Sequence, residues 1–250
     1  MSGLLAIMRK EWKTYFITPA AYVVLALFAF ISAFFFYNML AVFVMQSLAG
    51  GFGGANLNVN TQVLQPLTFD VGITLLFLLP MLTMRLYAEE MRSGTMELLK
   101  TAPVRRLEII LGKFLAAFGL LLLLLLIVVL YIAVLAHYGA PDLREAAVSL
   151  LGLALLGASF LSIGALISSF TRNQIVAGVI TFSLFLVLWI ADWPVAYSSG
   201  PVAKVVAYLS VTAHLQNFTQ GVLDLKDVIF YLSLILAGLF LTARRMELAE

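Results

Sequence analysis

The sequence contains no cysteine and very little charge. Its 250 residues include only 11% Asp, Glu, Lys and Arg, whereas 63% are hydrophobic. The missing cysteine excludes disulfides, thiolate metal sites and a cysteine nucleophile. Soluble domains carry about 25% charged residues. The composition therefore excludes an ordinary soluble domain and indicates an integral membrane protein.

The motifs of the common enzyme classes are also missing. No G-x-x-x-x-G-K-S/T loop occurs, because Gly112-Lys113 lacks the upstream glycine and the following hydroxyl, so nothing here cradles nucleotide phosphates. No H-E-x-x-H occurs, and His137 and His214 are far apart in sequence, with no metal-ligand spacing. We therefore predict that this chain is not an enzyme and binds no cofactor or metal itself.

Long apolar runs are what the sequence does have. A helix needs about 20 apolar residues to cross a bilayer core of about 30 Å, and most of the runs reach that length. We predict an all-α polytopic membrane protein, with residues 1–250 forming one transmembrane domain of six transmembrane helices. The predicted spans are 20–45, 67–85, 109–137, 147–170, 174–192 and 226–243.

Lysine and arginine fall mostly on alternate connections between these runs. Twelve lie on one predicted side, namely Arg9, Lys10, Lys13, Arg85, Arg92, Lys100, Arg105, Arg106, Lys113, Arg172, Arg244 and Arg245. Only three lie on the other, namely Arg144, Lys204 and Lys226. The positive-inside rule then puts both termini in the cytoplasm. We expect a multi-pass protein of a bacterial cytoplasmic (inner) membrane.

Residues 3–17 predict a separate helix before the first span. Their large apolar side chains recur at helical spacing, while Arg9, Lys10 and Lys13 occupy other faces. Such an amphipathic helix lies in the cytoplasmic interface, with Trp12 near the headgroups and its cations toward anionic lipid. The alternative is a continuation of the first span, but Thr18-Pro19 favours a break.

The densest polar segment, 86–108, lies on the predicted cytoplasmic side. Its candidate functional residues are Glu89, Glu90, Arg92, Gly94, Thr95, Glu97, Leu98 and Leu99. Gly94 permits a break in the backbone, and the residues after it predict a short amphipathic helix that Pro103 ends. The segment is either a solvated loop or a platform on which a soluble partner pushes on the membrane helices.

Four separated motifs resemble the ABC-2 type permeases, the membrane subunits of type V ABC exporters. They are Arg9-Lys10-Glu11 with Pro19, the segment 89–99 followed by 101–104 and 108–113, the turn 168–174, and the closing segment 209–231. The closing segment is most similar to the gliding-motility branch. The resemblance covers essentially the whole chain, but it says little about cargo.

The resemblance implies roles for three regions. Residues 89–99 form or flank the coupling helix that contacts a partner ATPase, and 3–17, with Arg9, Lys10, Trp12 and Lys13, match the amphipathic connecting helix. The outer-face segment 193–225 holds short helices before the last span, and we expect its His214 and Asp224 to organise that segment.

The resemblance also implies partners. It implies two copies of an ABC ATPase that bind ATP and Mg, a second or related permease, and in some arrangements a periplasmic or membrane-anchored accessory protein. The bilayer is the remaining partner, and we expect no nucleic acid.

Three functions stay open on the sequence. The leading one is the permease subunit of an ATP-driven exporter. A secondary transporter or channel predicts internal repeats and mid-membrane charges, and the sequence shows no convincing repeat and few central charges. A non-transporting scaffold that passes mechanical work to a periplasmic partner is the third. The cargo, homodimer versus heterodimer and the spans at a dimer interface are not determined by the sequence.

Overall fold

The computed structural model describes residues 3–49, 58–95, 104–138, 141–193, 200, 205–206 and 208–248. Within these residues the chain is helical and forms no strand. The elements are α1 (Gly3–Ile17), α2 (Pro19–Ala49), the π-helix η1 (Asn60–Leu64), α3 (Gln65–Thr83), α4 (Ala88–Ser93), α6 (Arg106–Tyr138), α7 (Leu143–Ser168), α8 (Gln174–Trp189), α10 (Val211–Thr219) and α11 (Leu225–Leu248).

Among the described residues, five helical stretches are long and apolar enough to cross a bilayer. They are Pro19–Leu48, Asn60–Ser93, Arg106–Tyr138, Leu143–Ser168 and Leu225–Leu248. This confirms the predicted all-helical fold with several apolar spans. The remaining apolar helix, α8, has 16 residues, or about 24 Å of length. It is shorter than the predicted fifth span, 174–192, because the helix ends at Trp189.

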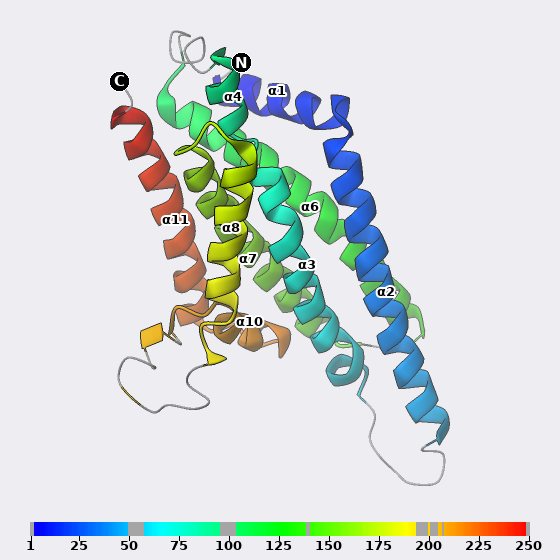
Figure 1. Ribbon diagram of the computed structural model, residues 1–250. Coiled ribbons are helices and arrows are strands. Elements are labelled where there is room, and N and C mark those ends of the chain that lie inside the picture. The colour runs from blue at the N-terminus through cyan, green and yellow to red at the C-terminus, as the bar shows by residue number, and fades with distance from the viewer. Residues whose placement is uncertain are drawn as a thin grey trace.

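The helices form an elongated bundle with two different ends (Figure 1). α1 lies across one end of the bundle, and α4 and both chain termini lie at that same end. α10, the last turn of α6 and the first turn of α7 lie at the opposite end. The chain turns at Thr18, between α1 and α2, so residues 3–17 do not continue the first span. We call the end that carries α1, α4 and the termini the terminal end.

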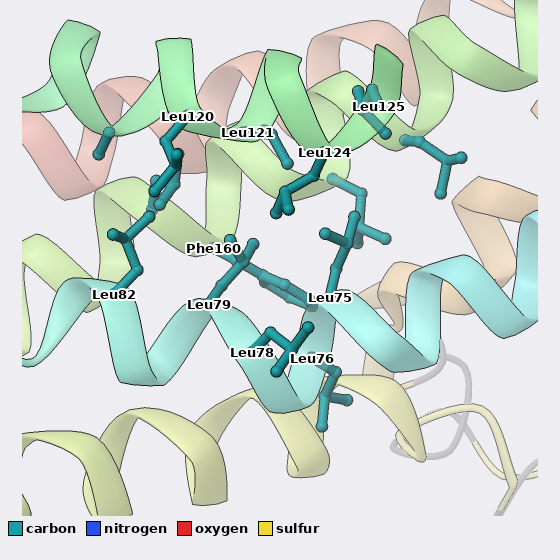
Figure 2. Close-up of a cluster of buried hydrophobic side chains, with 14 of the residues drawn as sticks. Leu75, Leu76, Leu78, Leu79, Leu82, Leu120, Leu121, Leu124, Leu125 and Phe160 are labelled. Carbon is teal, nitrogen blue, oxygen red and sulfur yellow. The ribbon is translucent and has the colours of Figure 1, made fainter. Parts of the chain in front are cut away.

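The core of the bundle is built from leucines of α3 and α6 around α7. Figure 2 shows Leu79 and Leu82 of α3 facing Leu120 and Leu124 of α6, with Phe160 of α7 among them. These side chains are fully or almost fully buried. Burial of each contributes roughly 1.5–3 kcal/mol relative to exposure in water, although in a bilayer close packing matters more than removal from water. This packing fixes α3 and α6 relative to each other.

Small residues on α7 allow neighbouring helices to approach it closely. A Cβ added at Gly157 would lie 2.5 Å from a methyl carbon of Leu121, and one at Gly164 would lie 2.4 Å from Oγ1 of Thr83. The face of α7 that carries Ala158 and Ser162 is likewise buried. The small-residue stripe of this helix is therefore a packing seam within the chain.

We predict that Gly164→Ala destabilises the protein, because its new methyl group would clash with the fully buried Thr83. Overpacking of this kind costs about 1–3 kcal/mol, and thermal unfolding in detergent measures it. The matched control is Gly178→Ala on α8, where the nearest atom is the flexible sulfur of Met84 at 3.3 Å. Equal melting temperatures for the two variants would contradict the close approach of α7 to α3.

Candidate functional site

The chain breaks between α3 and α4, and a serine from α7 satisfies the break. Residues 84–87 leave the helix, which frees backbone groups inside the protein. The Ser168 hydroxyl accepts hydrogen bonds from the N–H groups of Tyr87 and Ala88 and donates one to the carbonyl of Met84, each at 3.1 Å. A hydroxyl has one donor and two acceptor positions, so all are used. Ser168 thereby fixes the start of α4.

α4 places Glu90 next to a lysine of α6 and two charged residues of α1. Nζ of Lys113 lies 2.9 Å from Oε1 of Glu11 and 3.0 Å from Oε1 of Glu90. Nζ of Lys10 lies 2.8 Å from the same Glu90 oxygen and 3.5 Å from that of Glu11. We call Lys10, Glu11, Glu90 and Lys113 the charge cluster. Its two cations and two anions compensate each other.

The charge cluster is mostly buried, so its geometry is tightly constrained. The side chain of Lys113 is only 2% exposed, and its ammonium lies 5.4 Å from the centre of the Tyr87 ring. Removing a lysine from water costs several kcal/mol unless carboxylates compensate it. Lys113 therefore holds α1 and α4 against α6, since each supplies one of its two carboxylates.

Lys10 completes the charge cluster from the exposed side. Its burial lowers the pKa, but the hydrogen bond to Glu90 and the charges of Glu90 and Glu11 outweigh that effect. The pKa of Lys10 is therefore raised above its usual value, and the residue is a cation at neutral pH.

Glycines of α6 let α1 lie directly on this helix. A Cβ at Gly112 would meet the side chain of Ile7 at 2.9 Å, and one at Gly119 would meet the indole of Trp12 at 2.5 Å. The two glycines are seven residues apart, which is about two helical turns and puts them on one face. Side-chain packing and ion pairs thus fasten α1 to the same stretch of α6.

A second buried polar cluster lies at the opposite end, where α10 meets α11. Nδ1 of His214 lies 2.6 Å from Oδ1 of Asp227, and Nε2 of His214 lies 2.9 Å from the carbonyl oxygen of Tyr208. Asn217 donates to the other oxygen of Asp227 at 2.6 Å. A carbonyl oxygen only accepts, so Nε2 carries a proton and donates it to Tyr208, while Nδ1 faces the carboxylate.

Comparison with known families identifies the chain. It matches the family described as "ABC-2 family transporter protein" over residues 5–243, which is nearly its whole length. The chain belongs to the ABC-2 transporter family. No curated protein matches it. Membership agrees with the predicted class of a membrane-embedded permease, and members of this class work in general with an ABC ATPase.

The predicted coupling residues of this ABC-2 protein separate into buried and exposed sets. Glu90 belongs to the charge cluster, whereas Glu89, Arg92 and Thr95 are exposed on or just after α4. Gly94 is exposed and adopts φ of 74°, in the left-handed region that ends α4. The remaining candidates, Glu97, Leu98 and Leu99, lie outside the described residues.

The predicted connecting-helix residues likewise separate into exposed residues and residues that contact other helices. Arg9 and Lys13 are exposed on α1, Lys10 joins the charge cluster, and Trp12 packs on Gly119. Sequence reasoning missed Glu11 and Lys113 as site residues. The sequence could have predicted Lys113, because an ionisable residue inside an apolar run is costly unless another group compensates its charge.

Of the two outer-face candidates, only His214 is buried. Asp224 is exposed, accepts a hydrogen bond from the N–H of Lys226 and pairs with its side chain at 3.0 Å. That hydrogen bond lowers the pKa of Asp224 below its usual value. The carboxylate that holds His214 is instead Asp227, in the first turn of α11.

We predict that Lys113→Met strongly destabilises this protein, because it leaves Glu11 and Glu90 buried without a full counter-charge. Breaking a buried ion pair costs about 3–5 kcal/mol, which a thermal melt in detergent detects. The triple variant with Glu11→Gln and Glu90→Gln should recover most of the loss. The matched control is Lys226→Met, which removes an exposed lysine, and an equal loss there would argue against the charge cluster.

We also predict a difference between Asp227→Asn and Asp224→Asn. The first removes the carboxylate that faces His214 and Asn217 and should lower the melting temperature, since a buried charged hydrogen bond is worth about 1.5–3 kcal/mol. The second keeps a side-chain oxygen before α11, so the helix cap survives and the melting temperature should stay unchanged. Identical melts for both variants would disprove the role of Asp227.

Proposed function

We propose that this protein is the membrane-spanning permease subunit of an ATP-driven ABC exporter. In this proposal two copies of a separate ATPase bind ATP and Mg at the terminal end, and a second copy of the permease completes the transport unit. Both termini face the cytoplasm of a bacterial cell, and the protein resides in the inner membrane. The concentration of basic residues at the terminal end supports this orientation.

The proposal includes α8 as a sixth pass. α8 begins at the terminal end and runs beside α7 toward the opposite end (Figure 1). Phe160 of α7 and Phe185 of α8 stack with ring centroids 4.0 Å apart. A short apolar helix is accommodated by local thinning of the bilayer, at a fraction of a kcal/mol per Å of mismatch. Six passes then leave both termini on one side.

The single observation that carries the proposal is the charge cluster. It joins α1 and α4, the elements that resemble the connecting helix and the approach to the coupling helix, to the long apolar helix α6. A partner that displaces α1 or α4 therefore moves α6, unless it separates a buried lysine from its carboxylates. This is the arrangement that a permease driven from the cytoplasm requires.

The exposed residues at the terminal end are available to such a partner. Arg9 and Lys13 on α1 and Glu89 and Arg92 on α4 carry charges that no described residue neutralises by an ion pair. We propose that this surface, with the sequence candidates Glu97, Leu98 and Leu99, contacts the ATPase. Anionic lipid is the second partner of the α1 cations.

The distribution of buried charge favours this function over a secondary transporter. Among the described residues, the buried charged side chains are Glu11, Glu90, Lys113 and Asp227, with His214 beside Asp227. They lie at the two ends of the bundle, whereas transporters driven by ions place charges and broken helices near the membrane midplane. A gliding-type scaffold, which works on a periplasmic accessory protein through the same ATPase contact, is the second candidate, supported by the resemblance of the segment 209–231.

We predict that Gly94→Val uncouples the permease from its ATPase, whereas Gly94→Asn does not. A Cβ at Gly94 meets no atom within 4 Å, so only its positive φ opposes substitution. Asn adopts that conformation more readily than other residues, and a β-branched residue is strongly disfavoured there. Both new side chains therefore have room, and the two variants differ in how readily they adopt the positive φ of this position.

The measurement is ATP hydrolysis by the complex of the full chain with the ABC ATPase that co-purifies with it, in lipid nanodiscs. Gly94→Val should lower permease-dependent hydrolysis by about fivefold or more, in the range of coupling energies of 1–3 kcal/mol, with normal membrane insertion. Gly94→Asn should keep most of it. Wild-type hydrolysis in Gly94→Val would contradict a coupling role for this turn.

A further inference from the structure

A recess lies at the elbow where α1 turns into α2, next to α3. Its enclosed part is small, about 50 Å³, and it opens to the surface of the bundle. Ala21, Val24 and Leu82 provide apolar wall, while Tyr15, Arg85 and Glu89 provide polar groups. Because α1 crosses the end of an apolar bundle, the elbow lies at the depth where lipid headgroups meet acyl chains. The recess thus offers apolar and polar surface at the level where phospholipids change from one to the other.

Tyr15 gives independent evidence for an occupant. Its side chain is buried, and its hydroxyl has no hydrogen-bond partner among the described residues. Burial, together with the nearby charge of Glu11, raises the pKa of Tyr15 well above its usual value, so the hydroxyl keeps its proton. A buried hydroxyl without a partner costs roughly 1–3 kcal/mol. A ligand that accepts a hydrogen bond in the recess would remove that cost.

The charges at the mouth specify the kind of ligand. Glu11 also lines the recess, but its charge is compensated by Lys10 and Lys113. Arg85 and Glu89 remain, one cation and one anion, neither of them ion-paired in the described part of the chain. They are four residues apart, but residues 84–87 are not helical, so the usual pairing on one helix face does not apply. The recess therefore presents a separated pair of opposite charges.

We propose that this recess binds the headgroup of one aminophospholipid. The phosphate accepts from the guanidinium of Arg85 and the hydroxyl of Tyr15, and the primary ammonium donates to the carboxylate of Glu89. An acyl chain continues along the apolar wall formed by Ala21, Val24 and Leu82. A choline headgroup has no N–H to donate to Glu89, and a glycerol headgroup has no cation. The site rests on α1 lying at the interface and does not depend on the ATPase.

Native mass spectrometry of the full chain tests this, with the detergent-purified protein offered palmitoyl-oleoyl phosphatidylethanolamine, phosphatidylglycerol or phosphatidylcholine. The wild type should retain one phosphatidylethanolamine in preference to the other two lipids. Arg85→Gln should lower that occupancy about tenfold, as expected for loss of a charge-assisted hydrogen bond. The matched control is Arg172→Gln, which removes an exposed cation in the turn between α7 and α8, and its occupancy should equal that of the wild type.

Two further variants separate the roles of the polar groups. Glu89→Gln should remove the preference for phosphatidylethanolamine over phosphatidylcholine, because it removes the acceptor for the ammonium. Tyr15→Phe should lower phosphatidylethanolamine retention several-fold without lowering the melting temperature of the lipid-free protein. Equal retention of the three lipids by the wild type, or equal phosphatidylethanolamine retention by Arg85→Gln and Arg172→Gln, would overturn the proposal. Either result leaves the ATPase-coupled function untouched, since no ATPase is present.

Discussion

One buried lysine determines how the terminal end of this protein is assembled. Lys113 lies at the start of the long apolar stretch of α6, and its side chain is only 2% exposed. Its charge must be compensated locally, and both carboxylates come from outside its own helix, Glu11 from α1 and Glu90 from α4. Buried ion pairs contribute little net stability compared with apolar packing, but they specify which elements meet. Here they specify that α1 and the short helix α4 after the chain break are both held against α6.

The two ends of the bundle are held by polar contacts, whereas the middle is held mainly by apolar packing. Between the ends, leucine, phenylalanine and small residues form most of the core (Figure 2), with a few hydrogen-bonded polar side chains among them, such as Ser32 with Tyr131. At two places where the backbone leaves a helix near an end, a side chain satisfies the freed groups: Ser168 does so for residues 84–88, and His214 does so for the carbonyl of Tyr208. In a medium without water, a chain break is tolerated only with such partners. These two polar side chains therefore lie where the chain leaves a helix.

Much of the fold could be read from the sequence, because helices in lipid depend on local composition. The apolar runs predicted an all-helical chain with several long apolar helices, and Thr18-Pro19 predicted the break between α1 and α2. The site was harder to predict, since its contacts join residues far apart. Glu11 and Lys113 are separated by 102 positions and Lys10 and Glu90 by 80, so no spacing rule links them. At the other end, Asp224 and Asp227 looked equivalent near His214, and only the first turn of α11 decides which one is buried.

The side-chain hydrogen bonds and ion pairs that join α4 to other helices are made with α1, α6 and α7, although α3 precedes α4 directly in the chain. The hydrogen-bonded helix of α3 stops at Thr83, three residues after Pro80, which cannot donate its own backbone hydrogen bond. From Tyr87 onward, the backbone is held by Ser168 of α7 and Glu90 is held by Lys113 of α6. In the proposed function, a displacement of α4 therefore reaches α6 and α7 directly through these polar contacts. α3 follows through its close packing on α7, where Gly164 meets Thr83, and not through a continuous helix into α4.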